Sequence, residues 1–426
     1  MTELATAFTL PCGISIPNRL AKAAMTEGLA EPGGIAGARI ARAYTAWAQG
    51  GAGMILTGNI MVDRRYRERP ANVVVDGAQS EAAFQGLQRY AEACKAGGGV
   101  AIAQISHAGR QSPAIIAPEP VGPSAVAVKL PGGVFAAPRA LTEPEIEDVI
   151  ARFAHTAKTL CEAGFDGVQV HAAHGYLISE FLNPNVNQRE DRWGGRLENR
   201  ARLLIETVRA VRAAIGPAKA LSVKLNSSDF QKGGFSFEDC LAVVALLDAE
   251  GIDLLEISGG NYEQPRMMGL EGMEPVFEGD VRETTRAREA YFMAYAEKVI
   301  ETAKTPIMVT GGFRSKPAME EAVEAGVAVI GVGRPLCVDP DAPRQILEGR
   351  VAALRAWEEQ LTLGSGFFGP ASTNDIIKAA NGFAALAFFY RNILRLGDGK
   401  PVKRKMNLLG ALIAHQLQER RDARTH

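Results

Sequence analysis

Short apolar segments alternate with longer amphipathic segments, and this alternation recurs eight times along the chain. Each unit opens with a run the length of a buried strand and continues through a loop into a stretch with helical spacing of apolar positions. The strand segments are Leu20–Met25, Gly53–Ile60, Val100–Ser106, Gly167–His171, Ala220–Asn226, Ile252–Ser258, Ile307–Gly311 and Val327–Gly331. The helical segments are Ala38–Gln49, Glu81–Lys95, Pro144–Ala163, Leu197–Ile215, Phe237–Ala249, Arg286–Thr302 and Pro317–Ala325.

Helix signals stand at the borders of these segments. Thr142 precedes Pro144 and Ser236 precedes Phe237, as N-caps do, and a glycine ends a helix just before a strand at Gly164, Gly251 and Gly326. Eight such units, with strands apolar on both faces, predict a closed α/β fold, the (β/α)8 barrel. A doubly wound open sheet is the alternative. Residues 6–19 predict a small N-terminal β-hairpin around Pro11-Cys12-Gly13.

Two inserts and a tail interrupt the repeat. Residues 107–141 and 259–285 follow the third and sixth strands, on the side where a barrel carries its site, so both are candidate lids or substrate walls, or else surface decoration. We expect the barrel to occupy residues 1–350 and a C-terminal helical extension residues 351–426. The extension contains the apolar run G-F-A-A-L-A-F-F-Y, which is too short to span a membrane. It is expected to pack on the barrel or on a partner subunit, which would make a homo-oligomer.

Composition narrows the class of protein. The net charge of −1 gives no electrostatic footprint for nucleic acid or for an anionic membrane. The five cysteines lie far apart with no C-x-x-C pair, so we expect no metal site and no iron–sulfur cluster. Reduced thiols, the absence of signal-peptide features at the first residues and the lack of a long apolar segment predict a cytoplasmic protein.

Polar rings gather where the fourth predicted strand ends. His171 stands at the strand terminus, and His174 and Tyr176 follow within five positions. Ligand sites of α/β proteins lie at the carboxyl ends of strands, so we interpret H-x-x-H-x-Y as a functional group rather than as packing.

Other strands deliver polar groups to the same end. Met25-Thr26 follows the first strand, Gly58 ends the second and Gln104 stands on the third. Lys224 on the fifth strand would enter the barrel interior, where an ammonium requires an anionic partner or a reaction.

Glycine-rich loops follow the last two strands and contain Gly312 and Gly333, with Arg334 next. Barrels bind phosphate at such loops through backbone N–H groups, and a guanidinium suits phosphate. A phosphate ligand extending from there would meet Thr26, Gln104 and Lys224, which suit a flat heterocycle whose reduced form is an anion. That description fits flavin mononucleotide (FMN).

Four motifs carry a family resemblance: A-Q-I-S-H-A-G-R, V-H-A-A-H-G-Y-L-I-S-E-F-L-N-P, D-R-W-G-G-R-L-E-N-R and G-V-G-R-P-L. They resemble the Old Yellow Enzyme family of flavin-dependent ene reductases, in order and spacing, from residue 5 to about residue 350. The resemblance implies a (β/α)8 barrel with FMN at the carboxyl ends of its strands and a hairpin closing the other end.

The resemblance also implies roles for single residues. Met25, Thr26, Gly58, Gln104 and Lys224 would contact the flavin ring, and Gly312, Gly333 and Arg334 its phosphate. His171 and His174 would bind the oxygen of an activated alkene, and Tyr176 would donate a proton to its α-carbon. Independently of the resemblance, Tyr66 and Tyr262 stand in the loops after the second and sixth strands, and we expect them to shape the substrate pocket. NADH or NADPH would be the transient reductant, since no G-x-G-x-x-G opens a helix after a strand.

Lys224 departs from the arginine that is general in the family, and Ala24 from its common proline. The relatives with an iron–sulfur cluster are disfavoured because Cys337 stands alone after the phosphate loops. Two other functions stay open at this point: a barrel lyase using Lys224 as a Schiff-base lysine, and a flavin-binding protein without turnover.

Overall fold

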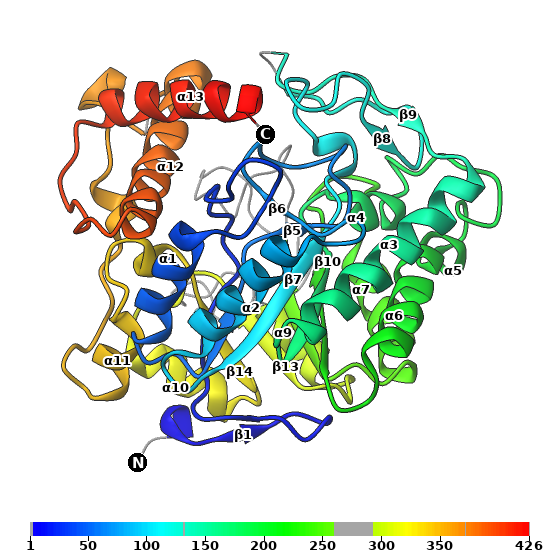
Figure 1. The fold of residues 1–426 in the computed structure, drawn as a ribbon, viewed down its shortest axis with the longest axis horizontal. Helices are drawn as coiled ribbons and strands as arrows, with labels where there is room; N and C mark the ends of the chain where they lie inside the picture. The colour runs from blue at the N-terminus through cyan, green and yellow to red at the C-terminus, as the bar shows by residue number, and fades with distance from the viewer. Residues whose placement is uncertain (1–2, 131–132, 260–292, 371, 426) are drawn as a thin grey trace.

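Eight parallel strands close into a barrel with helices around it (Figure 1). The computed structural model describes residues 3–130, 133–259, 293–370 and 372–425. The barrel strands are β3 (Leu20–Lys22), β4 (Met54–Leu56), β7 (Val100–Ser106), β10 (Gly167–Ala172), β11 (Ala220–Asn226), β12 (Leu254–Ser258), β13 (Ile307–Thr310) and β14 (Val329–Val332). Each pairs with the next, and β14 pairs with β3. The closure confirms the predicted barrel and excludes the open sheet.

The predicted helical segments are found with two differences in extent, and the short helices Leu177–Leu182 and Ala342–Leu347 were not predicted. The helices are α1 (Ala38–Ala48), α2 (Glu81–Lys95), α3 (Glu143–Glu162), α4 (Leu177–Leu182), α5 (Leu197–Arg200), α6 (Arg202–Ile215), α7 (Phe237–Ala249), α9 (Met293–Ile300), α10 (Lys316–Glu324), α11 (Ala342–Leu347), α12 (Asp375–Gly397) and α13 (Leu408–Thr425). The segment expected as one helix over 197–215 is two helices that meet at Ala201. The expected helix 286–302 is described only over α9, because its first residues lie outside the described part of the chain.

Short strands complete the sheets. β1 (Phe8–Thr9) and β2 (Ser15–Ile16) pair antiparallel, which confirms the N-terminal hairpin. The predicted strand 53–60 divides into β4 and β5 (Ile60–Met61), and β5 pairs with both β7 and β6 (Val73–Val74). In the insert 107–141, β8 (Val121–Gly122) pairs with β9 (Arg139–Ala140). The insert 259–285 lies almost wholly outside the described residues.

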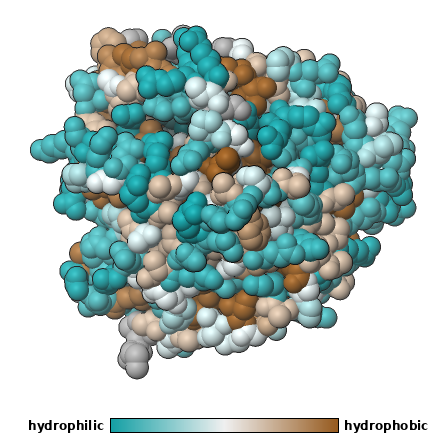
Figure 2. All heavy atoms as spheres, in the orientation of Figure 1, coloured by the Kyte–Doolittle hydropathy of each residue, from teal (hydrophilic) through white to brown (hydrophobic). Residues whose placement is uncertain are grey.

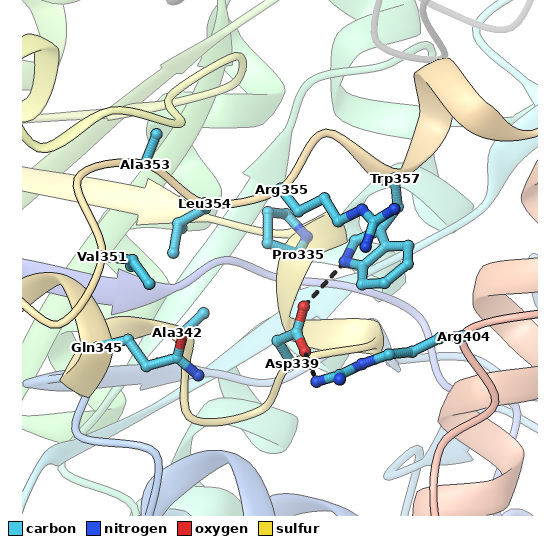
Figure 3. A pocket seen from close by; sticks show the side chains of 10 residues that line it. All are labelled: Pro335, Asp339, Ala342, Gln345, Val351, Ala353, Leu354, Arg355, Trp357 and Arg404. Carbon is cyan, nitrogen blue, oxygen red and sulfur yellow. Dashed lines mark hydrogen bonds and ion pairs between the residues drawn. The ribbon is translucent and has the colours of Figure 1, made fainter.

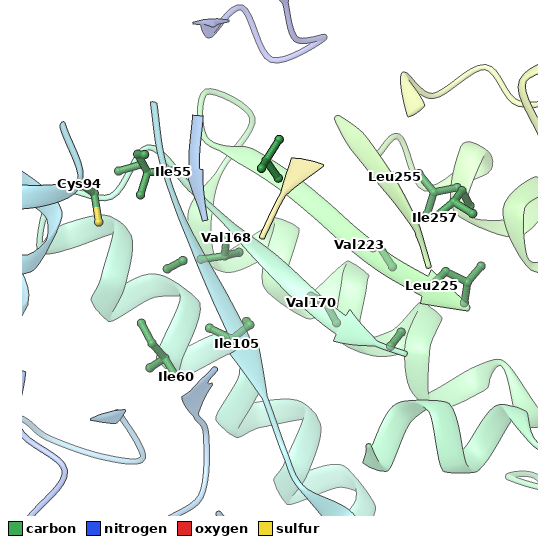
Figure 4. Packing of buried hydrophobic residues seen from close by; sticks show 14 of the residues in the cluster. Ile55, Ile60, Cys94, Ile105, Val168, Val170, Val223, Leu225, Leu255 and Ile257 are labelled. Carbon is green, nitrogen blue, oxygen red and sulfur yellow. The ribbon is translucent and has the colours of Figure 1, made fainter. Parts of the chain in front are cut away.

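Along β10, β11 and β12, polar residues that face the barrel interior alternate with apolar residues that face the surrounding helices. Val168 and Val170 of β10 belong to the large core shared with the surrounding helices, as do Val223 and Leu225 of β11 and Leu255 and Ile257 of β12 (Figure 4). Successive strand residues face opposite sides of a sheet. The residues between these apolar pairs, Gln169, Lys224 and Glu256, therefore face the barrel interior.

The interior itself has two layers. Toward the amino ends of the strands it is apolar and is capped by Leu10 and Ile16 of the hairpin, packed against Leu56, Ile102 and Met308. Figure 1 shows the hairpin beneath this end of the barrel. Toward the carboxyl ends the interior becomes polar, which places the chemistry at one mouth.

The C-terminal extension packs against the barrel. Its apolar run lies in α12, where Phe388 is fully buried, and α12 contacts α1. Arg39 of α1 forms an ion pair with Asp398 at 2.9 Å just after α12. Figure 1 shows α13 at the opposite end of the molecule from the hairpin. The division of the chain near residue 350 stays a prediction.

Exposed large apolar side chains gather on the extension. Of the eight such residues in the described part of the chain, five lie beyond residue 350: Phe368, Phe383, Leu409, Ile413 and Leu417. The hydropathy surface shows apolar atoms near the top of the face over α12 and α13 (Figure 2). No helix within the described ranges has both the length and the apolar character needed to cross a membrane. The expected homo-oligomer stays a prediction.

Candidate active site

The three polar rings predicted to converge do so at the end of β10. The His171 and His174 rings lie 5.1 Å apart between centroids, and the Tyr176 ring lies 4.7 Å from that of His171. His174 holds a positive φ of 63°, which a residue other than glycine rarely adopts. Asn226 at the end of β11 stabilises this turn, because its side-chain oxygen accepts the His174 backbone N–H at 3.1 Å. The local backbone thus turns His174 back toward the strand end.

The two histidines contact each other, and each also contacts a serine at the end of another strand. His171 Nε2 lies 3.1 Å from His174 Nδ1, His171 Nδ1 lies 3.4 Å from Ser106 Oγ, and His174 Nε2 lies 2.7 Å from Ser258 Oγ. Burial, with a smaller contribution from the nearby charge of Lys224, holds the pKa of both imidazoles well below the usual value. Both are therefore neutral at neutral pH, and each carries one N–H. Opening the contact between them would release one ring N–H and one ring acceptor toward a ligand.

These buried histidines make stability depend on pH. His107 is also buried, and burial lowers its pKa to about 4. A histidine with a depressed pKa contributes stability above its unfolded value of about 6.5 and loses it as pH falls toward the folded value. We expect the free energy of unfolding to fall between pH 6.5 and pH 5 by up to about 1.4 kcal/mol per pH unit for each of the three histidines. Urea unfolding at pH 7, 6 and 5 measures this slope, and His107→Asn should reduce it; an unchanged slope would contradict the assignment of His107.

Tyr176 is held by a carboxylate that the sequence did not indicate. Its hydroxyl donates to Glu68, and the ring packs with Met61, Val74 and Ala108. Glu68 also accepts the hydroxyl of Thr26, so one buried carboxyl group joins the ends of two strands.

A row of polar side chains crosses the barrel interior below the histidines. Gln104 Nε2 donates to Gln169 Oε1 at 2.8 Å, and Gln169 Nε2 donates to Glu256 Oε2 at 2.9 Å. Lys224 Nζ lies 2.9 Å from Glu256 Oε1, and these two side chains are 6% and 0% exposed. Glu256 is thus the anionic partner that a buried ammonium requires. No Schiff-base chemistry is needed to explain a lysine there, so nothing favours the lyase alternative.

The loop after β3 lies against Gly58. A Cβ added to Gly58 would meet the backbone oxygen of Met25 at 2.4 Å and the Cα of Thr26 at 2.8 Å, so only glycine fits. The Gly58 N–H donates to Glu27 Oε1 at 2.9 Å. The Gly58 N–H is therefore bonded to Glu27, whereas the family resemblance implied that Gly58 contacts the cofactor.

Glu27 is itself buried, and burial raises its pKa. The hydroxyls of Tyr44 and Tyr90 donate to it. Lys22 of β3 lies nearby on the outer side of the barrel, 4.9 Å from the ring centroid of Tyr44, and burial lowers its pKa to about 8. This cluster fixes the loop that carries Met25 and Thr26.

Two guanidiniums flank the glycine loops after β13 and β14. Arg334 lies 3.6 Å from Glu358, and Arg314 pairs with the same carboxylate. Gly312 has a φ of 80°, as the tight turn after β13 requires. Gly333 faces the Met25 side chain, whose sulfur a Cβ would approach at 3.8 Å. The predicted anion-binding residues therefore meet at one place, where a carboxylate of the extension already contacts both arginines.

A shallow cavity of about 220 Å³ opens beside this place, between the barrel and the extension (Figure 3). Asp339 accepts the indole N–H of Trp357 at 2.9 Å and a guanidinium N–H of Arg404 at 2.7 Å. These bonds connect the extension to the segment that follows β14, so the cavity lies at the contact between the extension and the barrel.

The residues present fit FMN. The Gln104 amide and the Lys224 ammonium supply donors for a heterocycle edge, and Arg314 and Arg334 supply cations for a phosphate. Thr310 Oγ1, at the end of β13, is buried and has no hydrogen-bond partner within the described part of the structure, as expected of a group that awaits a ligand.

The remaining predicted residues are placed differently. The ring of Tyr66 packs on His107, with centroids 5.3 Å apart, and its place in a substrate pocket stays a prediction. Tyr262 lies outside the described residues. Sequence reasoning missed Glu27, Glu68 and Glu256. An acid inside an apolar strand was the available signal for Glu256, while Glu68 is hidden in the charged run R-R-Y-R-E-R.

Comparison with known proteins agrees with this geometry. Residues 11–352 match the model of the NADH:flavin oxidoreductase / NADH oxidase family. An NADH-dependent flavin oxidoreductase of Hypocrea jecorina (strain QM6a) is 34% identical over 357 residues, which cover 80% of this chain and 88% of that protein. One from Neonectria sp. (strain DH2) is 35% identical over 354 residues, covering 79% of this chain, and the match spans only 46% of that protein's length.

A solved structure gives the same answer. Morphinone reductase in complex with tetrahydroNAD superposes with a TM-score of 0.66 at 26% identity, covering 83% of this chain and 92% of that one. With the family match, this likeness shows an enzyme of the flavin-dependent oxidoreductase class that binds FMN. The chain therefore belongs to the NADH:flavin oxidoreductase / NADH oxidase family, the Old Yellow Enzyme family that its motifs resemble.

Proposed function

We propose that this protein uses NADH or NADPH to reduce the C=C bond of an α,β-unsaturated carbonyl compound or a related activated alkene. The observation that carries the proposal is the meeting of His171, His174 and Tyr176 at one strand end, where Lys224 is the register partner of His171. Such a reduction needs hydrogen-bond donors that bind the substrate oxygen and a group that donates a proton, both on one side of a flat cofactor.

Each side chain has a defined part in this proposal. FMN, when bound, would supply the hydride chemistry that links the nicotinamide to the β-carbon of the alkene. His171 and His174 bind the substrate oxygen once their mutual contact opens, and because both are neutral, they polarise the carbonyl by hydrogen bonding rather than by full charge. Tyr176 gives a proton to the α-carbon.

Other residues position the cofactor. Thr26 and Gln104 would contact the ring, with the Met25 and Gly58 backbone beside it. Lys224 would face the pyrimidine edge, and because Glu256 offsets its charge, it would favour the anionic reduced form less than an unpaired cation does. Gly312, Gly333 and Arg334 would hold the phosphate.

Anaerobic steady-state turnover tests the reaction. The holoenzyme is mixed with NADH or NADPH and 2-cyclohexenone, with cyclohexene as the control alkene that lacks an activating oxygen. We expect nicotinamide oxidation that depends on the enone and yields cyclohexanone, and none with cyclohexene. A separate aerobic assay tests oxygen as the acceptor. If the enzyme reduces oxygen but reduces neither 2-cyclohexenone nor a nitroalkene, the proposal is overturned and a different acceptor is favoured.

The phosphate site has its own test. Arg334→Ala is expected to weaken FMN binding by about 10- to 100-fold, because a hydrogen bond to a charged group contributes about 1.5–3 kcal/mol. Titration of the apoprotein by flavin fluorescence quenching measures this. Riboflavin lacks the phosphate and serves as the matched control ligand, so its affinity should not change. An equal loss with both ligands would place Arg334 away from the phosphate.

A further inference from the structure

Hydrogen bonds from two other segments hold the backbone of His174 in its turn. The His174 N–H donates to the side-chain oxygen of Asn226 at 3.1 Å, and the His174 carbonyl oxygen accepts the side-chain amide of Gln111 at 2.9 Å. Asn226 and Gln111 are both buried. Because the left-handed φ of His174 is unfavourable for any residue other than glycine, the turn and the direction of the ring depend on these contacts.

A buried carboxylate sets the direction of the Asn226 amide. Asp229 is 1% exposed and lies in the loop between β11 and α7. Its Oδ1 accepts the side-chain amide of Asn226 at 2.8 Å, and its Oδ2 accepts that of Asn183 at 2.6 Å. Burial raises the pKa of Asp229 to about 6, so at pH 8 the group is ionised and can only accept hydrogen bonds.

The chemistry of its two neighbours leaves Asn226 a single orientation. A backbone N–H can only donate, and an ionised carboxylate can only accept. Asn226 therefore turns its amide nitrogen to Asp229 and its oxygen to His174. A flipped amide would set donor against donor at His174 and oxygen against oxygen at Asp229, and it would leave buried polar groups unpaired.

We propose that Asp229 is a positioning residue for the substrate oxygen: by orienting Asn226, it keeps His174 in the turn from which the ring reaches that oxygen. The inference rests on the proposed alkene reduction, in which His174 binds the oxygen. The ring of His174 lies 3.1 Å from His171 Nε2 and 2.7 Å from Ser258 Oγ. A relaxed turn would therefore move the ring away from both and weaken binding of an oxygen ligand.

Titration of the oxidised holoenzyme with 4-chlorophenol at pH 8 tests the inference without turnover. A phenol offers an oxygen to the histidines and a ring to the flavin, whose absorbance reports binding. In Asp229→Asn, residue 229 has one acceptor for two amide donors, so the Asn226 amide can flip. We expect the Kd for 4-chlorophenol to rise about tenfold or more, and kcat/KM for 2-cyclohexenone to fall by a similar factor.

The affinity for FMN is the control for this variant. Asp229 is bonded to Asn226, Asn183 and the backbone of Phe235, and none of these three is predicted to contact the cofactor. The Kd for FMN should therefore stay within about twofold of the wild-type value.

Two matched variants separate orientation of Asn226 from general damage. Asn183→Ala removes the other amide donor to the same carboxylate and leaves Asp229 facing Asn226, so its Kd for 4-chlorophenol should stay within about threefold of wild type. The double variant Asn226→Asp with Asp229→Asn exchanges the two groups. The new carboxylate at position 226 accepts the His174 N–H and the new amide at position 229, whose oxygen accepts from Asn183. This variant should recover most of the affinity lost in Asp229→Asn.

Each outcome decides between the two proposals. Unchanged phenol binding in Asp229→Asn overturns the inference, as does an equal loss in Asn183→Ala or a double variant no better than Asp229→Asn. Should Asp229→Asn fail to fold, phenol binding by the double variant supports the inference and its loss overturns it. If the wild type binds the phenol and this pattern holds but no enone is reduced, the proposed function fails and the positioning of His174 stands. If the enone is reduced and the pattern is absent, this inference alone fails.

Discussion

Replacing Tyr176 by phenylalanine is expected to slow reoxidation of the reduced enzyme by an enone about 10²- to 10⁴-fold, the usual contribution of a positioned general acid. Reduction of the enzyme by NADH should stay within about twofold, because that step moves a hydride and needs no proton from Tyr176. The substitution is sterically mild: the ring contacts with Met61, Val74 and Ala108 remain, and Glu68 keeps Thr26 and Asn72 as donors. Anaerobic stopped-flow absorbance resolves the two half-reactions.

An acceptor that takes electrons without forming a C–H bond is the control for this variant. Ferricyanide should reoxidise the wild type and Tyr176→Phe at the same rate. If ferricyanide and the enone are slowed equally, Tyr176 acts on the cofactor rather than on the α-carbon. If neither is slowed, another group donates the proton.

Removing the carboxylate of Glu256 is expected to cost about 3–5 kcal/mol of folding free energy, because it leaves Lys224 buried without an anionic partner. The Glu256 side chain is 0% exposed, so water does not reach the site to compensate. Gln169 would lose an acceptor in the same change, since its amide donates to Glu256 at 2.9 Å. Urea unfolding of Glu256→Ala followed by circular dichroism, with FMN at one fixed saturating concentration, measures this loss.

Two further variants separate charge from shape. Glu256→Gln keeps acceptors for Gln169 and Lys224 and should lose less stability than Glu256→Ala. The double variant Glu256→Leu with Lys224→Met removes both charges, and it should also be more stable than Glu256→Ala, since no buried charge is left unpaired. A double variant less stable than Glu256→Ala would show that the ion pair is not the cause.

The fold was accessible from the sequence because its main signal repeats. Each of the eight predicted strand segments overlaps a barrel strand, and the hairpin was marked by Pro11-Cys12-Gly13. The predicted bounds of helices and strands are wrong where the local sequence pattern carries no signal of a break. Helical spacing of apolar residues runs straight through Ala201, where α5 ends and α6 begins. The strand after Gly53 is interrupted at Gly58, where close approach of another loop requires glycine.

The site was accessible only in part, for a physical reason. His171, Gln104 and Lys224 stand on strands, so their place at the barrel mouth follows from topology. Glu68 stands in a loop segment, and the approach of its side chain to Tyr176 depends on how that loop packs. Two ion pairs could not be predicted either. Pairing of Lys224 with Glu256 depends on the register of their strands, and pairing of Arg334 with Glu358 depends on the position of the extension.

The two-layered barrel interior divides the chain into regions that tolerate change differently. Substitutions that repack Leu56, Ile102 or Met308 beneath the histidines can alter heat resistance without touching a reacting atom. In the polar layer, apolar replacement of Lys224 together with Glu256 would remove a desolvation cost and also remove the side chain proposed to face the cofactor ring. Selection for thermostability should therefore accumulate changes in the lower layer, and a heat-stable variant altered in the upper layer should have lost its yellow colour.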